Sequence, residues 1–239
     1  MKIKAILVDL DDTLSVTKKY YDEALDVCHE VFNSITKLNY SIEHFKKLYM
    51  SARDETHALV PSSAAAHNRA IYFQKLIENL EIDTDFDLIY QLYHTYYSYV
   101  YNNMNLYPGA EELLKWFKDT KRTVVIVSDG SAHVRIEKIH TLGISKYVDY
   151  LVSSEEVGVD KPNNQPYLVA LNKAGVSKEE AIYIGNAIKT DIFGGERLNM
   201  ITVQVLVEGY TSKEEDPVKP DYVVKDLLKI KKIIEKLEK

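Results

Sequence analysis

The chain begins with a short apolar run and repeats this pattern several times further on. Ile3–Val8 reads I-K-A-I-L-V and ends in acidic residues. A short apolar run bounded in this way predicts a buried strand. Similar runs predict five further strands, at Thr123–Val127, Tyr147–Val152, Ala181–Ile184, Ile201–Val207 and Tyr222–Val224.

A different pattern follows the first strand. From about Val16 to Leu106 no segment has a convincing strand pattern, and apolar residues recur at helical spacing instead. The helices expected in this stretch are Tyr20–Lys37, Ser41–Arg53, Ala64–Leu80 and Asp83–Tyr101. In the second half, helices are expected between the strands at Gly109–Thr120, His133–Leu142, Gln165–Ala174, Asp191–Leu198 and Asp226–Lys239.

The alternation of strands and helices determines the expected fold class. Strands that alternate with helices of this length favour a mainly parallel sheet covered on both faces. We therefore expect an α/β protein with a Rossmann-like three-layer core and an inserted α-helical cap domain. Residues 1–15 and 107–239 are expected to form the core, and residues 16–106 the cap.

Composition and charge exclude several classes of protein. The 239 residues are 46% hydrophobic and 28% charged, which is ordinary for a soluble globular protein. A net charge of −6 argues against general nucleic-acid binding. The single cysteine, Cys28, excludes an intrachain disulfide framework and a multi-cysteine zinc site. No apolar run approaches the ~18 residues of a membrane helix. We expect a cytoplasmic protein without nucleic-acid or membrane partners.

Polar residues gather where the predicted strands end. Ligands of open α/β sheets bind beyond the carboxyl ends of the strands. The polar residues found there are Asp9, Asp11, Thr13, Ser128, Asp129, Lys161, Asn186 and Asp191. Carboxylates, a hydroxyl, a lysine and an amide at one edge of a sheet suit a phosphate ester together with a divalent cation.

Asp9 and Asp11 stand two positions apart, so an extended backbone places both side chains on one face. Like charges at this distance attract a hard cation and can raise the pKa of one of the two acids. This suits one carboxylate as nucleophile and the other as general acid/base. Taken alone, the same pair is more typical of turn formers or helix caps after a strand.

The order of these residues resembles the motifs of the haloacid dehalogenase superfamily. Its first motif, Asp-x-Asp-x-Thr after an apolar strand, is matched by Asp9, Asp11 and Thr13. Its second motif, a Ser or Thr that ends a strand, is matched by Ser128, and its third, a lysine often before proline, by Lys161. The resemblance is to the phosphatase branch with a helical cap inserted after the first motif (C1-type, subfamily I).

The fourth motif departs from the family pattern. It is usually Gly-Asp with a second acid four or five residues later, and here it reads Gly185-Asn186 followed by Asp191. An amide oxygen can ligate Mg²⁺ but carries no charge, and hard cations favour carboxylates. Either Asp191 takes over as ligand, or the site binds its metal more weakly.

The resemblance implies a Mg²⁺-dependent hydrolase of small phosphate monoesters that works through an aspartyl-phosphate on Asp9. It implies that Asp11 is the general acid/base, and that Lys161 pairs with Asp9 and stabilises charge in the transition state. Ser128 and the backbone N–H groups near Asp129 and Gly130 would hold the phosphate oxygens. The metal would be bound by Asp9, the backbone carbonyl of Asp11, and Asn186 or Asp191. The expected partner is a small phosphorylated metabolite, and the expected state a monomer or homodimer.

Three alternatives share this fold: a phosphomutase, a metal-independent dehalogenase and a non-catalytic binding protein. The family's dehalogenases also carry an Asn and an Asp in the fourth-motif region, but they lack the second aspartate of the first motif. Because Asp11 is present, the phosphatase is favoured. Selectivity is expected to reside in the cap, where Arg53, His57 and Arg69 are candidates to bind a substrate carboxylate or hydroxyl. The alternative is that these three are ordinary surface charges.

Overall fold

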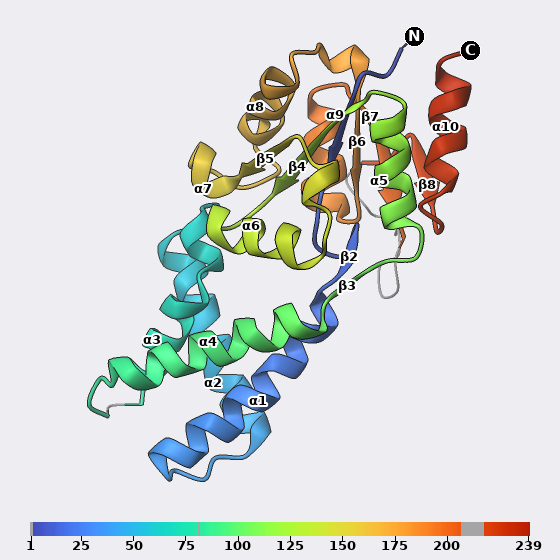
Figure 1. The fold of residues 1–239 in the computed structure, drawn as a ribbon. Coiled ribbons are helices and arrows are strands. Elements are labelled where there is room, and N and C mark those ends of the chain that lie inside the picture. The colour runs from blue at the N-terminus through green and yellow to red at the C-terminus, as the bar shows by residue number, and fades with distance from the viewer. Residues whose placement is uncertain (1, 81, 207–217) are drawn as a thin grey trace.

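A six-stranded parallel sheet forms the centre of the molecule. The computed structural model describes residues 2–80, 82–206 and 218–239. The strands are β1 (Ala5–Val8), β4 (Thr123–Ser128), β5 (Tyr150–Ser153), β6 (Ala181–Gly185), β7 (Ile201–Val205) and β8 (Tyr222–Val224). Their order is β5-β4-β1-β6-β7-β8, and every neighbouring pair runs parallel (Figure 1). The strand predicted to end at Val207 ends at Val205, and Val207 lies outside the described residues.

Helices cover both faces of this sheet. One face is covered by α5 (Ala110–Asp119), α6 (Ala132–Thr141) and α10 (Lys229–Leu237), and the other by α8 (Asn164–Ala174) and α9 (Phe193–Arg197). Alternate side chains of a strand point to opposite faces. Accordingly, Ile6 and Val8 pack with the first group of helices, and Ala5 and Leu7 with the second. All four residues of the central strand β1 are apolar and fully buried, and the strand ends where the acids begin.

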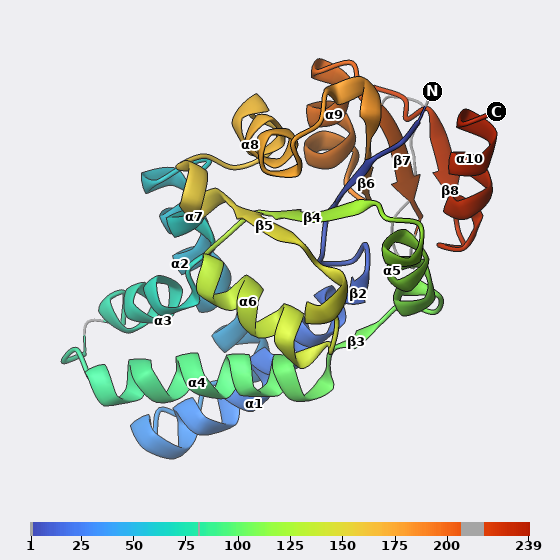
Figure 2. The ribbon, with the colours of Figure 1, turned by 45° about the horizontal axis from the view of Figure 1, so that its top comes forward.

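The predicted helical insertion lies between β1 and β4. Its helices are α1 (Lys18–Thr36), α2 (Ile42–Leu59), the short 3₁₀ helix η1 (Ala64–His67), α3 (Arg69–Glu78) and α4 (Phe86–Asn103). We call residues 18–103 the helical insert. It has an apolar cluster of its own, in which aliphatic residues pack with aromatic ones such as Phe32, Phe45, Phe73 and Tyr96. Figure 2 shows α4 beside α6, where Val134 joins this cluster.

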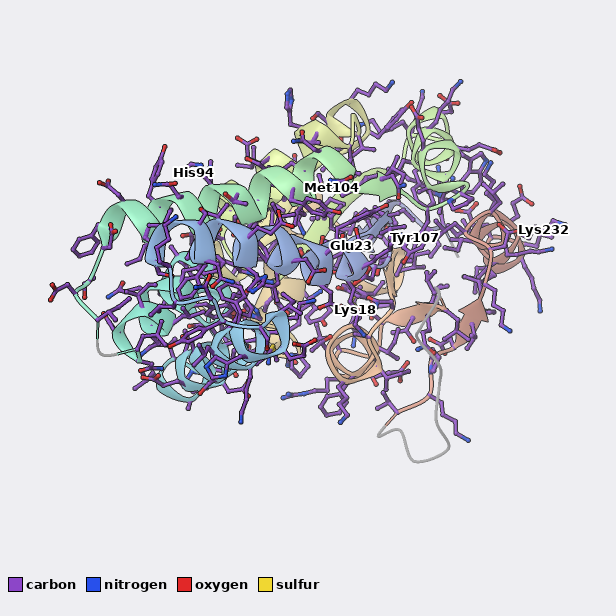
Figure 3. All side chains as sticks on the ribbon, turned by 90° about the horizontal axis from the view of Figure 1, so that it is seen from below. Lys18, Glu23, His94, Met104, Tyr107 and Lys232 are labelled. Carbon is purple, nitrogen blue, oxygen red and sulfur yellow. The ribbon has the colours of Figure 1, made fainter. Side chains whose placement is uncertain are left out.

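A two-stranded ladder joins the helical insert to the sheet. Strand β2 (Ser15–Val16) pairs antiparallel with β3 (Asn105–Leu106). The N–H of Tyr107 extends the ladder by donating to the carbonyl of Leu14 at 2.9 Å. The chain therefore leaves the core and returns to it side by side, and Figure 3 shows Met104 and Tyr107 at the returning connection. Two-residue strands are too short for any periodicity, so this ladder was not predicted.

Two predicted helices are divided in the structure. Ala64–Leu80 is broken at Asn68, whose side chain accepts from the N–H of Ala70 at 2.9 Å and begins α3. In place of one helix over Asp191–Leu198, a π-helical turn η4 (Ile188–Ile192) precedes α9. Such turns accompany functional sites, and this one contains Asp191.

Three short helices complete the core: η2 (Ser145–Tyr147), α7 (Ser154–Val157) and η3 (Lys178–Glu180). The predicted α/β fold with a three-layer core and a helical insertion is confirmed. Among the described residues, no helix combines the length and the apolar character that crossing a membrane requires.

Candidate active site

A polar cavity of about 230 Å³ lies at the carboxyl ends of β1, β4 and β6. The seven residues proposed from the sequence for catalysis, phosphate binding and metal binding all line it: Asp9, Asp11, Ser128, Asp129, Lys161, Asn186 and Asp191. Most of them lie far apart along the chain and meet because parallel strands end at one edge. The helical insert contributes Tyr21, His67 and Arg69 to the same cavity.

Lys161 joins two carboxylates at the base of this cavity. Its Nζ lies 2.8 Å from Oδ1 of Asp9 and 2.7 Å from Oδ1 of Asp191. The ammonium also donates to the carbonyl of Val127 at 3.1 Å, and all three charged residues are buried. Charge-assisted hydrogen bonds of this length fix the positions of both partners. Lys161 is therefore held against the carboxylate that the sequence nominates as nucleophile.

One ammonium does not balance the two carboxylates beside it. Burial raises the pKa of Asp9 to about 7, and the neighbouring charge of Asp191 adds to this, although Lys161 opposes the shift. Desolvation disfavours a charged form unless an opposite charge compensates. This part of the cavity is therefore short of positive charge, and a further cation beside Asp9 would favour its ionised form.

Asp191 is fully committed to hydrogen bonds within the protein. Its Oδ2 accepts from the backbone N–H groups of Asn186 at 3.1 Å and Ala187 at 3.0 Å. Its Oδ1 accepts from the hydroxyl of Tyr183 at 3.2 Å as well as from Lys161. A Cβ on Gly185 would lie 2.5 Å from the Cβ and Cγ of Asp191, so only glycine fits at the end of β6. Asp191 braces Lys161 and the loop after β6.

Asn186 faces the first motif across the sheet. Its Oδ1 lies 3.0 Å from the hydroxyl of Thr13, which is also 3.1 Å from Oδ2 of Asp9. A threonine hydroxyl has one proton, so it donates to only one of these two oxygens at a time. Thr13 thus links Asp9 to Asn186, and Asn186 presents a neutral oxygen where the family usually has a carboxylate.

Asp11 is held in a cluster of cations and hydroxyls. The Nζ of Lys138 on α6 lies 2.6 and 2.7 Å from its two carboxylate oxygens, and Nη1 of Arg135 lies 3.3 Å from Oδ2. The hydroxyls of Thr17 and Tyr21 also donate to this carboxylate. Burial opposes ionisation, but Lys138 and Arg135 outweigh it and hold the pKa of Asp11 below its usual range. In this arrangement Asp11 is a carboxylate, not the protonated acid that donation to a leaving group needs.

The loop after β4 is braced from a neighbouring loop. Oδ1 of Asp129 accepts from the backbone N–H of Lys161 at 2.9 Å, and the N–H of Gly130 donates to Oγ of Ser154 at 2.6 Å. Asp129 therefore fixes the backbone of Lys161, and the Gly130 N–H is bonded to the hydroxyl oxygen of Ser154 in this structure. Ser128 is buried at the end of β4 and lines the cavity.

Sequence reasoning missed the partners of these residues, above all Lys138, Arg135 and Tyr183. Lys138 is fully buried although it is a lysine. Its position on α6, four residues after Val134 and three after Arg135, places all three on the buried side of the helix. The sequence does contain one indication of this: Arg135 and Lys138 share a helix face with Val134, an apolar residue expected to be buried. Nothing in the local pattern around Tyr183 distinguishes its hydroxyl from an ordinary strand residue.

The three candidate selectivity residues of the insert differ in their surroundings. Arg53 is exposed and pairs with Asp54 at 2.9 Å. His57 shares a hydrogen bond of 3.1 Å with the hydroxyl of Tyr72. Only Arg69 lines the cavity. His67 joins it there, with its Nε2 3.1 Å from Oδ2 of Asp160 in the core.

The oxygen donors suit a magnesium ion that arrives with a phosphate. Within the described parts of the chain, no three His, Cys, Asp or Glu side chains are grouped as a metal site. Mg²⁺ is commonly bound by one or two carboxylates together with substrate phosphate and water. Asp9 and Asn186 provide one carboxylate and one amide oxygen, and the excess negative charge around Asp9 favours a cation. The residues therefore fit a weakly charged Mg²⁺ site.

Comparison with known proteins gives consistent results. The family model for haloacid dehalogenase-like hydrolases matches residues 3–199. The glyceraldehyde 3-phosphate phosphatase of Methanopyrus kandleri is 28% identical over 225 residues, which is 93% of each chain. The phosphoglycolate phosphatase of Nitrosococcus oceani is 29% identical over 165 residues, covering 66% of this chain and 72% of that protein.

A solved structure shows the same fold. The HAD phosphatase of Thermococcus onnurineus superposes with a TM-score of 0.71 at 22% identity, over 98% of both chains. The predicted enzyme class, a phosphatase of this superfamily, is confirmed by the family model together with relatives that carry phosphatase names. The chain belongs to the haloacid dehalogenase-like hydrolase family.

Proposed function

We propose that the protein hydrolyses a small phosphate monoester through a covalent phosphoryl intermediate on Asp9, with Mg²⁺ as cofactor. The observation that carries this proposal is the buried contact of 2.8 Å between Nζ of Lys161 and Oδ1 of Asp9 at the floor of the cavity. An acid fixed beside a cation, at the strand edge where ligands bind, suits a nucleophile for phosphorus. The names of the two relatives support a small phosphorylated substrate.

The reaction takes place in two displacements. In the first, a carboxylate oxygen of Asp9 forms a bond to phosphorus, and the bond from phosphorus to the ester oxygen breaks. The leaving alkoxide gains a proton and departs as the alcohol. In the second, water attacks phosphorus, loses a proton, and releases inorganic phosphate while the carboxylate of Asp9 is regenerated. Lys161 offsets the negative charge in both steps, and Ser128 donates a hydrogen bond to a phosphate oxygen.

Asp11 serves as the general acid/base in this scheme, with one condition. Its carboxylate is clamped by Lys138 and Arg135, which favours the ionised form. A proton reaches the alkoxide from Asp11 only when this carboxylate turns away from Lys138 towards the ester oxygen. Thr17, directly before the helical insert, and Tyr21, in its first helix, hold the same carboxylate.

The magnesium ion would be held by Asp9, the backbone carbonyl of Asp11 and Asn186. Asp191 is the weaker candidate, because four protein donors already occupy its two oxygens. Bound there, the ion would offset the repulsion between the Asp9 carboxylate and the phosphate. Asp191 instead positions Lys161 and the loop that carries Asn186.

The helical insert acts as a cap in this proposal, with residues 16–106 as the cap domain and residues 1–15 and 107–239 as the catalytic core. Two connections at the β2–β3 ladder join them, and the insert adds Tyr21, His67 and Arg69 to the cavity wall. An enclosed site excludes bulk water and strengthens the electrostatic interactions inside it.

A panel of small phosphate monoesters, assayed with Mg²⁺ and with a chelator, tests the proposal. Phosphate release is expected with Mg²⁺ and not with the chelator, and the Asp9→Asn variant is expected to be inactive in both. Failure of the wild type to hydrolyse any ester with any divalent cation would reject it.

The neutral Asn186 favours one alternative, a hydrolytic dehalogenase that needs no metal. Such an enzyme would attack carbon and not phosphorus, and would release halide from a 2-haloacid in the presence of chelator. Assaying halide beside phosphate separates the two reactions in a single preparation.

A further inference from the structure

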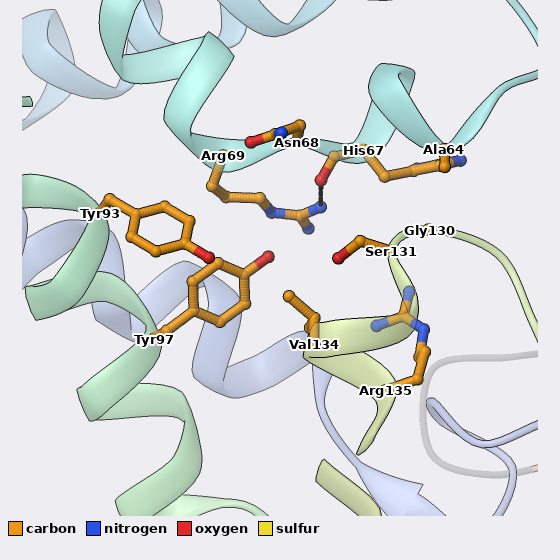
Figure 4. A pocket seen from close by; sticks show the side chains of 10 residues that line it. All are labelled: Ala64, His67, Asn68, Arg69, Tyr93, Tyr97, Gly130, Ser131, Val134 and Arg135. Atoms are coloured by element: carbon orange, nitrogen blue, oxygen red, sulfur yellow. Dashed lines mark hydrogen bonds between the residues drawn. The ribbon is translucent and has the colours of Figure 1, made fainter. Parts of the chain in front are cut away.

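A second, smaller cavity adjoins the active-site cavity where the helical insert meets the core. Its volume is about 40 Å³, and it shares His67, Arg69 and Arg135 with the larger one. Its remaining wall is formed by Tyr93 and Tyr97 of α4, the start of α3, and the loop that begins α6. Figure 4 shows the guanidinium of Arg69 and the hydroxyls of Tyr97 and Ser131 turned towards one another across this space. We call it the side pocket.

Arg69 is a cation without an acidic partner. Its guanidinium lies over the rings of three tyrosines, with the carbon Cζ 4.8 Å from the centroid of Tyr21, 5.6 Å from Tyr72 and 5.8 Å from Tyr96. Nη1 donates to the carbonyl of His67 at 2.6 Å, and the buried Nε has no hydrogen-bond partner in the described parts of the chain. Among those residues, no carboxylate forms an ion pair with it.

Two other arginines do have a carboxylate partner, although the buried Nε of Arg135, like that of Arg69, has no hydrogen-bond partner among the described residues. Arg135, on the opposite wall of the side pocket, pairs with Asp11 at 3.3 Å and donates to the carbonyl of Asp129. Arg53, in the same insert, pairs with Asp54 in solvent. Arg69 is partly buried, and withdrawing a cation from water without an anion beside it is costly; aromatic rings compensate only in part. Arg69 is therefore left with a charge that a bound anion would balance.

We infer that Arg69 binds a carboxylate on the part of the substrate that leaves with the alcohol oxygen. This rests on the proposed phosphatase function and narrows its substrates to phosphate esters of small hydroxy acids. The phosphate occupies the larger cavity beside Asp9, and the carboxylate enters the side pocket. Guanidinium and carboxylate form two parallel hydrogen bonds, which also fixes the direction of the ester.

The volume of the side pocket limits how large the acidic part of the substrate can be. A water molecule needs roughly 10–15 Å³ of a cavity measured in this way, so 40 Å³ holds about three water-sized groups. The three heavy atoms of a carboxylate fill that space, so a chain of one or two carbons would lie in the adjoining larger cavity. A sugar ring or a nucleobase does not fit in the side pocket.

Three two-carbon esters that differ in the group at the end of the tail, and so in its charge, test the inference. Phosphoglycolate carries a carboxylate, 2-hydroxyethyl phosphate a neutral hydroxyl, and phosphoethanolamine an ammonium. With Mg²⁺ present, kcat/KM of the wild type is expected to fall in that order. In Arg69→Gln, kcat/KM for phosphoglycolate is expected to fall about 10- to 100-fold, the loss of a charge-assisted pair, and for hydroxyethyl phosphate less than about threefold.

Two further variants separate the effect of losing the charge of Arg69 from an effect on the structure of the insert. Arg53→Gln removes an arginine of the same insert that does not line the cavity, and is expected to leave all three values unchanged. Arg69→Lys keeps the charge but not the paired geometry, and should recover part of the preference. Thermal melting checks that Arg69→Gln is folded.

The inference would be overturned if the wild type preferred the ester with the neutral or the cationic tail. It would also be overturned if Arg69→Gln lowered kcat/KM equally for all three esters. Either result would leave the phosphatase proposal standing. If the wild type hydrolyses none of the esters with Mg²⁺, the proposed function fails instead, and the inference fails with it.

Discussion

The two walls of the active-site cavity are built in different ways. On the core side, charged groups contact each other at about 2.6–2.8 Å, as Lys161 does with Asp9 and Asp191, and Lys138 with Asp11. On the side of the insert, Arg69 lies among tyrosine rings without an acid. In the proposed function, the core wall lacks only a cation beside Asp9 before substrate arrives, whereas the insert wall is completed by the substrate itself. In this proposal, the core wall carries out the chemistry that all phosphate esters share. The insert wall determines which ester is bound.

The largest effect is expected at the nucleophile. Asp9→Asn keeps the shape of the side chain but replaces a nucleophilic carboxylate by an amide. We expect turnover to fall about a thousandfold or more on every ester, with the melting temperature close to that of the wild type. Phosphate release under saturating Mg²⁺ measures this, and activity within tenfold of the wild type would show that Asp9 is not the nucleophile.

Removing the central cation should affect both stability and catalysis. Lys161→Met leaves two buried carboxylates without their partner, which costs about 3–5 kcal/mol of folding free energy and lowers turnover roughly 100-fold. Urea unfolding and steady-state kinetics measure the two effects. The double variant Lys161→Met, Asp191→Asn removes one of these carboxylates and should regain part of the stability but not the activity. Equal stability of wild type and Lys161→Met would contradict the described ion pairs.

The clamp on Asp11 predicts a pH-dependent difference in stability. The carboxylate of Asp11 has a lowered pKa in the folded protein because Lys138 and Arg135 outweigh burial. The contribution of Asp11 to the free energy of unfolding is fully present above the pKa of this residue in the unfolded chain, about 4. It is lost as the pH falls through the lower pKa of the folded protein. The wild type should be more stable than Lys138→Met near pH 6, and the gap should shrink below about pH 4. A gap that widens on acidification would argue against the clamp.

The smallest effect concerns the metal. Asn186→Asp adds a carboxylate at the fourth motif, and we expect tighter Mg²⁺ binding, about tenfold, because hard cations favour charged oxygens. Turnover at saturating Mg²⁺ should change only a few-fold. Titration of activity with Mg²⁺ gives the affinity, and Asn172→Asp on helix α8 is a control for added charge. An unchanged titration would show that Asn186 is not a ligand.

Periodicity was sufficient to predict most of the fold. The buried strands are short apolar runs, and the order of the motif residues indicated which strand ends meet. The β2–β3 ladder and the π turn around Asp191 were not predicted, since each depends on contacts made across the fold and not on local pattern.

The candidate site was predicted less completely. Asp9, Lys161 and Asp191 were nominated because the residue types follow strands in the order of a known motif set. The role of Lys138 depends on tertiary contact, because a lysine on a helix is normally solvated. Similarly, Arg53, His57 and Arg69 were equivalent candidates in the sequence, and only their positions in the folded chain distinguish them.

The central claim is that Asp9 carries the phosphoryl group during turnover, and rapid acid quenching followed by peptide mass spectrometry tests it most directly. With Mg²⁺ and a hydrolysed ester, we expect one phosphoryl group on the wild-type peptide that contains Asp9, and none in Asp9→Asn. Steady hydrolysis in which Asp9 is never labelled, or in which the label lies on another residue, would contradict the account.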